Sequence, residues 1–152
     1  MDKKIHGMVD VGEKPVTLRT ALAKASIRFS KSAFDVLKKK GSPKGDVFET
    51  ARIAGIMAAK RTAEAIPLCH PLELDKVSVM FLLKPLTSRV EILAEVKSHG
   101  RTGVEMEALH AASVAALTIY DMMKWTDQRM TIGDIQLLKK TGGQSCDFKF
   151  KN

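Results

Sequence analysis

The chain has 152 residues, a length that suits a single domain over residues 1–152. Its 45% hydrophobic and 28% charged residues are typical of a globular protein and exclude a disordered tail. Lysine and arginine outnumber aspartate and glutamate by 25 to 17, so the net charge of +8 predicts an anionic partner, either nucleic acid or a small phosphorylated ligand.

The first regular element is expected at residues 19–29. Small or apolar side chains occupy its odd positions from Ala21 to Phe29 and, apart from Leu22, polar ones its even positions. This period of two predicts a half-buried strand, although alanine by itself favours a helix. Ser30 is a suitable cap for a short helix that runs through Lys40 and stops at Gly41.

A second helix is predicted over residues 47–65, after a loop at 41–45. Asp46 caps it and Glu49 follows at the spacing of a capping box. Residues 66–72 cannot continue the helix, because prolines fix the backbone near both ends of the segment. The apolar positions at helical spacing are Phe48, Ile53, Ile56, Ala59 and Ala63.

The second half of the sequence predicts a hairpin, a long helix and a last strand. Strands at 77–83 and 89–97 are joined by a connection short enough for an antiparallel hairpin. A helix over 105–125 and a strand over 135–138 follow. The helix is smooth enough to lie close against a sheet or another chain, since one side carries Ala108, Ala111, Ala112, Ala115 and Ala116.

The order strand, helix, helix, hairpin, helix, strand predicts an α+β fold with helices on one face of a mainly antiparallel sheet. Two cysteines, Cys69 and Cys146, make no disulfide framework and suit a reducing compartment. The first residues hold no apolar run that could serve as a signal peptide, and no run of apolar residues is long enough to span a membrane. The expectation is a cytoplasmic protein.

Four basic residues lie at the edges of predicted elements: Arg19, Lys44, Lys60 and Lys140. Lys44 comes just before a helix start, where backbone N–H groups already favour an anion. Taken singly, each of them is better explained by a solvated surface position, which is where most basic side chains lie.

Leu68, Cys69 and His70 stand in the proline-bracketed loop. A histidine held in a rigid loop can serve as a general acid or base, or it can simply bond to the loop backbone. The pair Cys69–His70 lacks the ligand spacing of a zinc site, and nothing nearby would activate the cysteine as a nucleophile. No metal site is predicted.

The long helix carries charged residues at both ends. Glu105 and Glu107 flank Met106 in its first turn, where carboxylates suit the helix dipole. Asp121 and Lys124, three positions apart near its end, share a face and form either a surface ion pair or a proton relay. A lysine base needs a lowered pKa, and the aspartate by itself raises it, so the residues leave the choice open.

Several long motifs resemble one family. They are KGDVF at 44–48, TARIAGI at 50–56, AAKRT at 58–62, IPLCHPL at 66–72, TGVEMEAL at 102–109 and AASVAALTIYDM at 111–122. Together they resemble the MoaC family of cyclic pyranopterin monophosphate synthases, which acts in molybdenum cofactor biosynthesis. The likeness runs from about residue 8 to residue 148.

The resemblance implies a ferredoxin-like α+β core and a homohexamer, a trimer of dimers with the active site at the dimer interface. The implied activity is a lyase reaction without cofactor: (8S)-3',8-cyclo-7,8-dihydroguanosine 5'-triphosphate becomes cyclic pyranopterin monophosphate plus diphosphate. The pathway's upstream radical enzyme is a possible partner. Asp121 and Lys124 would be catalytic. Glu105 would join the acid/base work, and Leu68, Cys69, His70, Met106 and Glu107 would line the base and sugar. The triphosphate would be held by Arg19, Lys44, Lys60 and Lys140.

Residues 142–146 depart from the family's usual Gly-Gly-Lys-Ser-Gly, because Gln144 and Cys146 replace the lysine and the last glycine. A catalytically inactive member of the family is therefore one alternative, which the retained Asp121, Lys124 and His70 disfavour. A basic module that binds nucleic acid is another. Stacking on bases needs aromatics, and the hairpin strands offer only Phe81, so neither nucleic acid nor a membrane is expected as partner.

Overall fold

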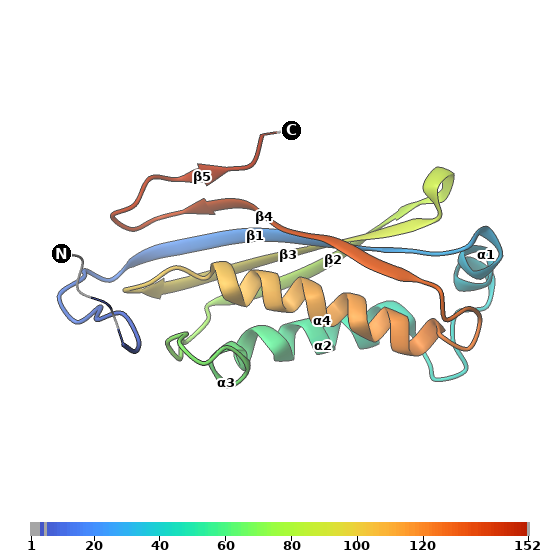
Figure 1. Ribbon diagram of the computed structural model, residues 1–152, viewed down its shortest axis with the longest axis horizontal. Helices are drawn as coiled ribbons and strands as arrows, with labels where there is room; N and C mark the ends of the chain where they lie inside the picture. Colours follow the sequence, from blue (N-terminus) through green and yellow to red (C-terminus); the bar gives the residue numbers. More distant parts are fainter. Residues whose placement is uncertain (1–3, 5, 152) are drawn as a thin grey trace.

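The computed structural model describes residue 4 and residues 6–151. Five strands form one sheet in the order β2-β3-β1-β4-β5, and neighbouring strands run antiparallel (Figure 1). The elements in chain order are β1 (Thr17–Arg28), α1 (Lys31–Lys39), α2 (Val47–Lys60), α3 (Thr62–Ala65), β2 (Lys76–Lys84), the 3-10 turn η1 (Pro85–Thr87), β3 (Arg89–Gly100), α4 (Glu105–Met123), β4 (Thr131–Thr141) and β5 (Phe148–Lys149).

Strand β1 is the centre of the sheet and confirms the alternation seen in the sequence. Its odd positions from Ala21 to Ile27 are at most 2% exposed and face the core. β1 pairs with β3 without a break, from Thr17 opposite Gly100 to Arg28 opposite Arg89. The small alanine side chains leave room for helices to pack closely on this face.

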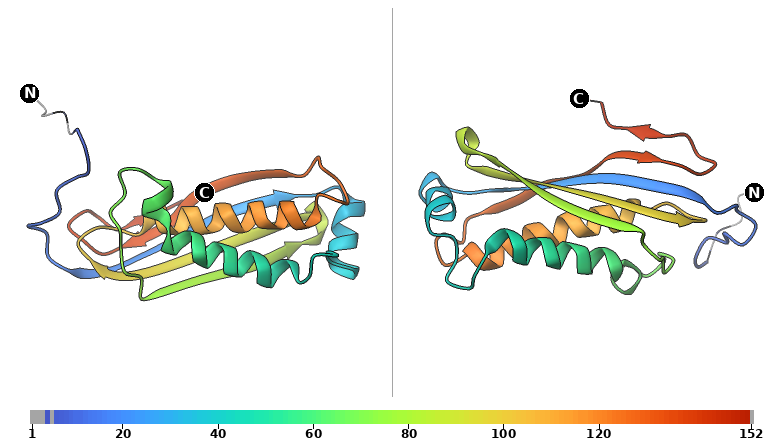
Figure 2. Two further views of the ribbon diagram at one scale, coloured as in Figure 1. Left: turned by 90° about the horizontal axis from the view of Figure 1, so that it is seen from below. Right: turned by 180° about the vertical axis from the view of Figure 1, so that it is seen from behind.

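Helices α2 and α4 cover one face of the sheet, and the other face is open (Figures 1 and 2). The five alanines of α4 from Ala108 to Ala116 are fully buried, so this side of the helix lies against the sheet and α2. Gly55 marks the closest approach of the two helices, because a Cβ there would lie 3.0 Å from the carbonyl oxygen of Ala111. The predicted α+β class and ferredoxin-like plait are confirmed.

The predicted helix over 47–65 is wrong in one respect: it breaks at Arg61, whose φ of −117° and ψ of 20° are not helical. The Thr62 hydroxyl lies 3.1 Å from the carbonyl oxygens of Ala58 and Ala59 and bonds to the end of α2. A short helix, α3, then starts in a new direction. Ile53, expected on the apolar side, is 60% exposed, and small residues form the buried side instead.

Other element boundaries also differ from the prediction. β1 starts at Thr17 and ends at Arg28, and α4 ends at Met123. β4 extends over Thr131–Thr141 rather than 135–138, because pairing with β1 supplies backbone hydrogen bonds where the side-chain pattern is irregular. The register of that pair shifts twice, which explains why alternation did not reveal its length. No helix in the described part of the chain is long and apolar enough to cross a membrane.

Candidate active site

The start of α4 and the loop that follows α3 enclose a pocket of about 180 Å³. The segments come together at the end of the sheet where α3 lies (Figure 1). The structure thus brings together residues from the loop and from the first turn of the helix, as the sequence predicted. The predicted residues that line the pocket are Leu68, Cys69, His70, Glu105, Met106 and Glu107.

Glu107 is the most unusual group in this pocket. Its side chain points to the buried side of α4 and is only 4% exposed. Burial raises the pKa of Glu107 to about 7; the nearby negative charge of Glu105 adds to this rise, and a backbone hydrogen bond partly opposes it. The carboxyl group therefore gains and loses a proton near neutral pH, as a general acid or base must.

Cys69 lies close to this carboxyl group. Burial, and secondly the charge of Glu107, raises the pKa of the Cys69 thiol above its usual value. A thiol in this setting stays protonated, which agrees with the expectation that it is not a nucleophile. In the part of the chain that the structure describes, His, Cys, Asp and Glu side chains form no group of three or more that could hold a metal ion.

Three of the predicted phosphate-binding cations surround the same end of α4. Lys140 Nζ lies 3.1 Å from Glu105 Oε1, and both side chains are 28% exposed. Arg19, only 7% exposed, donates from Nε to the carbonyl oxygen of Gly100 at 3.3 Å. Lys60, at the last position of α2, lines a small neighbouring cavity of about 110 Å³ together with Glu107.

Arg19 lies under the segment that departs from the family motif. Gly143 has a φ of +87°, and a Cβ there would collide with the Arg19 guanidinium group. A Cβ on Gly142 would collide with the carbonyl oxygen of Leu18. The two glycines therefore let the backbone close over the arginine, which makes Arg19 a buried cation rather than a surface one.

The other predicted catalytic residues lie at the opposite end of α4. Asp121 Oδ1 is 2.8 Å from Lys124 Nζ, and Asp121 Oδ2 is 2.7 Å from Lys44 Nζ. The hydrogen bonds from Lys124 and then Lys44 lower the pKa of Asp121 to about 2, and Asp121 in turn raises the pKa of Lys124. In this arrangement Lys124 is a protonated ammonium group and is not available as a base.

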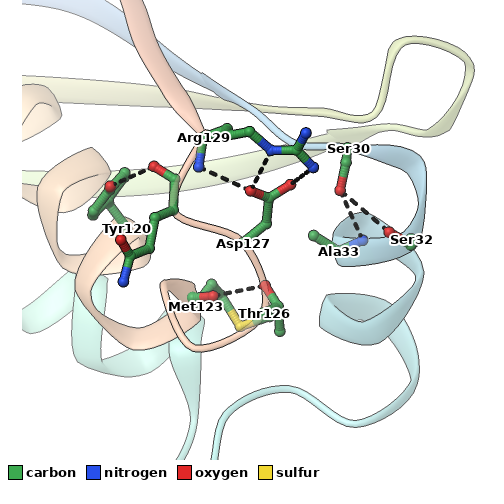
Figure 3. A network of polar contacts seen from close by, with 9 residues as sticks. Ser30, Ser32, Ala33, Tyr120, Met123, Thr126, Asp127 and Arg129 are labelled. Atoms are coloured by element: carbon green, nitrogen blue, oxygen red, sulfur yellow. Dashed lines mark hydrogen bonds and ion pairs between the residues drawn. The ribbon is translucent and has the colours of Figure 1, made fainter.

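The chain just beyond α4 is fixed by its own polar contacts (Figure 3). Tyr120 Oη donates to the carbonyl oxygen of Gln128 at 2.7 Å, and Thr126 Oγ1 donates to the carbonyl oxygen of the last α4 residue at the same distance. Asp127 accepts from the backbone N–H of Arg129 at 2.9 Å and from its guanidinium group at 3.0 Å. These contacts hold the end of the helix, and with it the backbone of Lys124, in one conformation.

The predicted site residues thus form two clusters in one chain. Between Glu105 and Asp121 lie sixteen helical steps (105 to 121), a separation of about 24 Å at the rise of an α-helix. The first cluster holds the pocket and three cations, and the second holds Asp121, Lys124 and Lys44. One side of α4 that faces away from the sheet connects the clusters, and its residues at helical spacing are Met106, His110, Ser113, Leu117 and Asp121.

The comparisons with known proteins decide the family. The MoaC family profile matches residues 8–143. The chain belongs to the MoaC family. Curated relatives named cyclic pyranopterin monophosphate synthase are 54% identical over 99% of this chain (Parvibaculum lavamentivorans), 56% over 93% (Herpetosiphon aurantiacus) and 57% over 93% (a Roseiflexus species). The matches cover 94%, 87% and 89% of those relatives. The predicted family and its enzymatic character are confirmed.

The sequence led us to assign the acid/base role to Glu105, and it did not reveal the burial and raised pKa of Glu107. A signal was present, because Glu107 is spaced four and eight residues before Ala111 and Ala115, on the buried alanine face. Glu105 instead pairs with Lys140, whose strand position could not be aligned with α4 from the sequence. The pairing of Lys44 with Asp121, 77 residues apart, was equally hidden.

Proposed function

We propose that this MoaC-family chain converts (8S)-3',8-cyclo-7,8-dihydroguanosine 5'-triphosphate to cyclic pyranopterin monophosphate and diphosphate. The observation that carries the proposal is a pocket with a carboxyl group whose pKa is near neutrality, with three cations close to the same end of α4. Ring rearrangement needs proton transfers, and loss of diphosphate needs positive charge close to the leaving oxygens. The cluster at the start of α4 supplies the carboxyl group and three cations, and the cluster at the end of α4 supplies Lys44 and Lys124.

In this proposal the triphosphate takes the place of the carboxylates that now hold the lysines. Lys140 and Lys44 are paired with Glu105 and Asp121 in the free protein. A phosphate group with its greater charge competes for both ammonium groups and forms stronger, charge-assisted hydrogen bonds. As the cyclic phosphate closes, the bond from the α-phosphorus to diphosphate breaks, and the lysines stabilise the charge on the departing group.

The two clusters have different roles in the reaction. Glu107, with a pKa near neutrality, accepts a proton from the substrate ring and later returns it. Lys124, kept protonated by Asp121, supplies a positive charge that stabilises negative charge on the other side of the substrate. His70 and Leu68 line the pocket that would receive the base and sugar.

We further infer that each complete site is made by two chains, because one chain keeps its clusters about 24 Å apart. The α4 side that connects them bears exposed apolar groups, with Met106 38% and Leu117 58% exposed. A two-fold axis perpendicular to the helix would pack this side against its own copy in the antiparallel sense. The start of one α4 then meets the end of the partner's α4, and the clusters join.

A homohexamer, a trimer of such dimers, needs a second interface. The open face of the sheet supports one, since Leu18, Met80 and Leu82 are exposed and alternate with the core-facing residues of β1 and β2. Light scattering that gives a mass of six chains would support the hexamer, and a monomer at micromolar concentration would refute both interfaces.

A nucleic-acid partner receives no support from the sheet. Phe81, the aromatic residue of β2, packs against Phe48 of α2 with tilted rings at a centroid distance of 5.1 Å, on the face that the helices cover. It is not available to a base.

The proposed activity is tested by turnover. The purified protein is mixed with the cyclic dihydroguanosine triphosphate, and the pterin product and diphosphate are measured together. Equal amounts of both products are expected from the parent protein, with at least a hundredfold loss in Lys124→Ala and Asp121→Asn. A folded, hexameric parent that forms neither product would refute the proposal and favour an inactive member of the family.

A further inference from the structure

The turn that carries Lys44 is held in a defined conformation. The backbone N–H of Gly45 donates to the carbonyl oxygen of Ser42 at 3.2 Å, and Pro43 occupies the second position of this tight turn. The Ser42 hydroxyl accepts a hydrogen bond from the backbone N–H of Lys44 at 3.1 Å. Ser42 therefore fixes the backbone from which the lysine side chain departs.

The same hydroxyl group is attached to α4. Ser42 Oγ donates to the carbonyl oxygen of Met122 at 2.7 Å, across 80 residues of sequence. This carbonyl is among the last four of the helix, which have no partner within it. Met122 directly follows Asp121, so one side chain joins the lysine turn to the helix end that carries the aspartate.

The Lys44–Asp121 contact needs such an attachment. Its atoms are 2.7 Å apart, yet both side chains are about half exposed, at 52% and 50%. An exposed pair of this kind is weak, because water screens the charges and a long lysine side chain loses rotamer freedom in forming it. A lysine on an unattached loop would spend much of its time elsewhere.

We propose that Ser42 is a positioning residue for the reaction: by bonding the turn to the end of α4 it holds Lys44 beside Asp121 in the free protein, where the incoming triphosphate meets the lysine. The inference rests on the proposed function, in which Lys44, Asp121 and Lys124 act on one substrate. Among the described residues, the Ser42 hydroxyl bonds to the Met122 carbonyl oxygen and the Lys44 N–H and makes no hydrogen bond to the Asp121 or Lys124 side chain, so it acts through Lys44.

The first test does not depend on turnover. The Asp121 carboxyl group is titrated by carbon NMR in protein labelled at aspartate. Its pKa of about 2 reflects Lys124 and Lys44 together, so Ser42→Ala should raise it, whereas Ser42→Thr, which keeps the hydroxyl, should not. Thr118→Val is the matched control, because it also removes a hydroxyl bond to a carbonyl of α4 but contacts neither Lys44 nor Lys124 through that bond. An Asp121 titration unchanged in Ser42→Ala would overturn the inference.

The second test is a double-mutant cycle on kcat/KM. Ser42→Ala should lower it by about threefold to tenfold, the range expected for one neutral hydrogen bond. In a Lys44→Met background the same change should cost nothing more, because the residue acts through Lys44. Independent losses in the two variants would contradict the positioning role. If the parent does not turn over the substrate at all, the proposed function fails, and the NMR titration still decides whether Ser42 positions Lys44.

Discussion

Two inactive variants should restore activity to each other if the site is shared between chains. Lys124→Ala damages the cluster at the end of α4, and Glu107→Gln damages the cluster at its start. In a mixed dimer, one site contains both lesions. The second site contains the intact start of α4 from the Lys124→Ala chain and the intact end of α4 from the Glu107→Gln chain. The recovery is thus a consequence of where α4 places its charged residues.

The size of the recovery follows from two-fold symmetry. Suppose that the variants are co-expressed in equal amounts. Half of the sites then receive an intact end of α4, and half, independently, receive an intact start of α4. About a quarter of the parent activity should therefore return, from two proteins that are each inactive. A site built within one chain would recover nothing, since every chain carries a lesion.

The assay uses two affinity tags, one on each variant, and native mass spectrometry to verify mixed oligomers before turnover is measured. The matched control pairs Lys124→Ala with Asp121→Asn. Both substitutions affect the cluster at the end of α4, where the two side chains are 2.8 Å apart. Every site in a mixed dimer therefore contains one of the two lesions. Mixed oligomers of Lys124→Ala and Glu107→Gln that remain inactive would refute the shared site.

Three further predictions concern stability. The pKa of Glu107 is raised to about 7 from 4.5, so the folded state binds its proton more tightly than the unfolded state does. The free energy of unfolding should therefore fall by about 3 kcal/mol between pH 4.5 and 7 and then level off. Glu107→Gln should remove this fall in urea titrations across the pH range; an identical pH dependence in both proteins would contradict the buried carboxyl. Gly55→Ala should destabilise by about 1–3 kcal/mol, because the new Cβ meets the Ala111 carbonyl at 3.0 Å and Val79 Cγ2 at 3.2 Å. Thermal unfolding checks this, and an unchanged Tm would show that α2 and α4 lie further apart. Asp121→Asn, at an exposed position, should leave the Tm within about 2 °C of the parent although activity is lost; a large drop in Tm would mean that the residue supports the fold rather than the reaction.

The sequence by itself determined the elements that rest on local patterns. Alternation over residues 21–29 predicted the central strand, and Asp46 with Glu49 predicted the start of α2, whose cap bond the structure contains. The prolines around residues 68–70 predicted the loop. These features depend on neighbours in the chain, so one sequence is enough to reveal them.

Tertiary structure decided what depends on distant partners. The exposure of Ile53 and the full length of β4 were set by α4 and β1, which lie far away in the sequence. The pKa of Glu107 is raised because its side chain is buried where the loop meets the first turn of α4. A sequence shows that a residue can carry charge, but it does not show whether the side chain is removed from water. The separation of the two clusters by the length of α4 likewise exists only in three dimensions, and it is the physical reason for expecting a second chain.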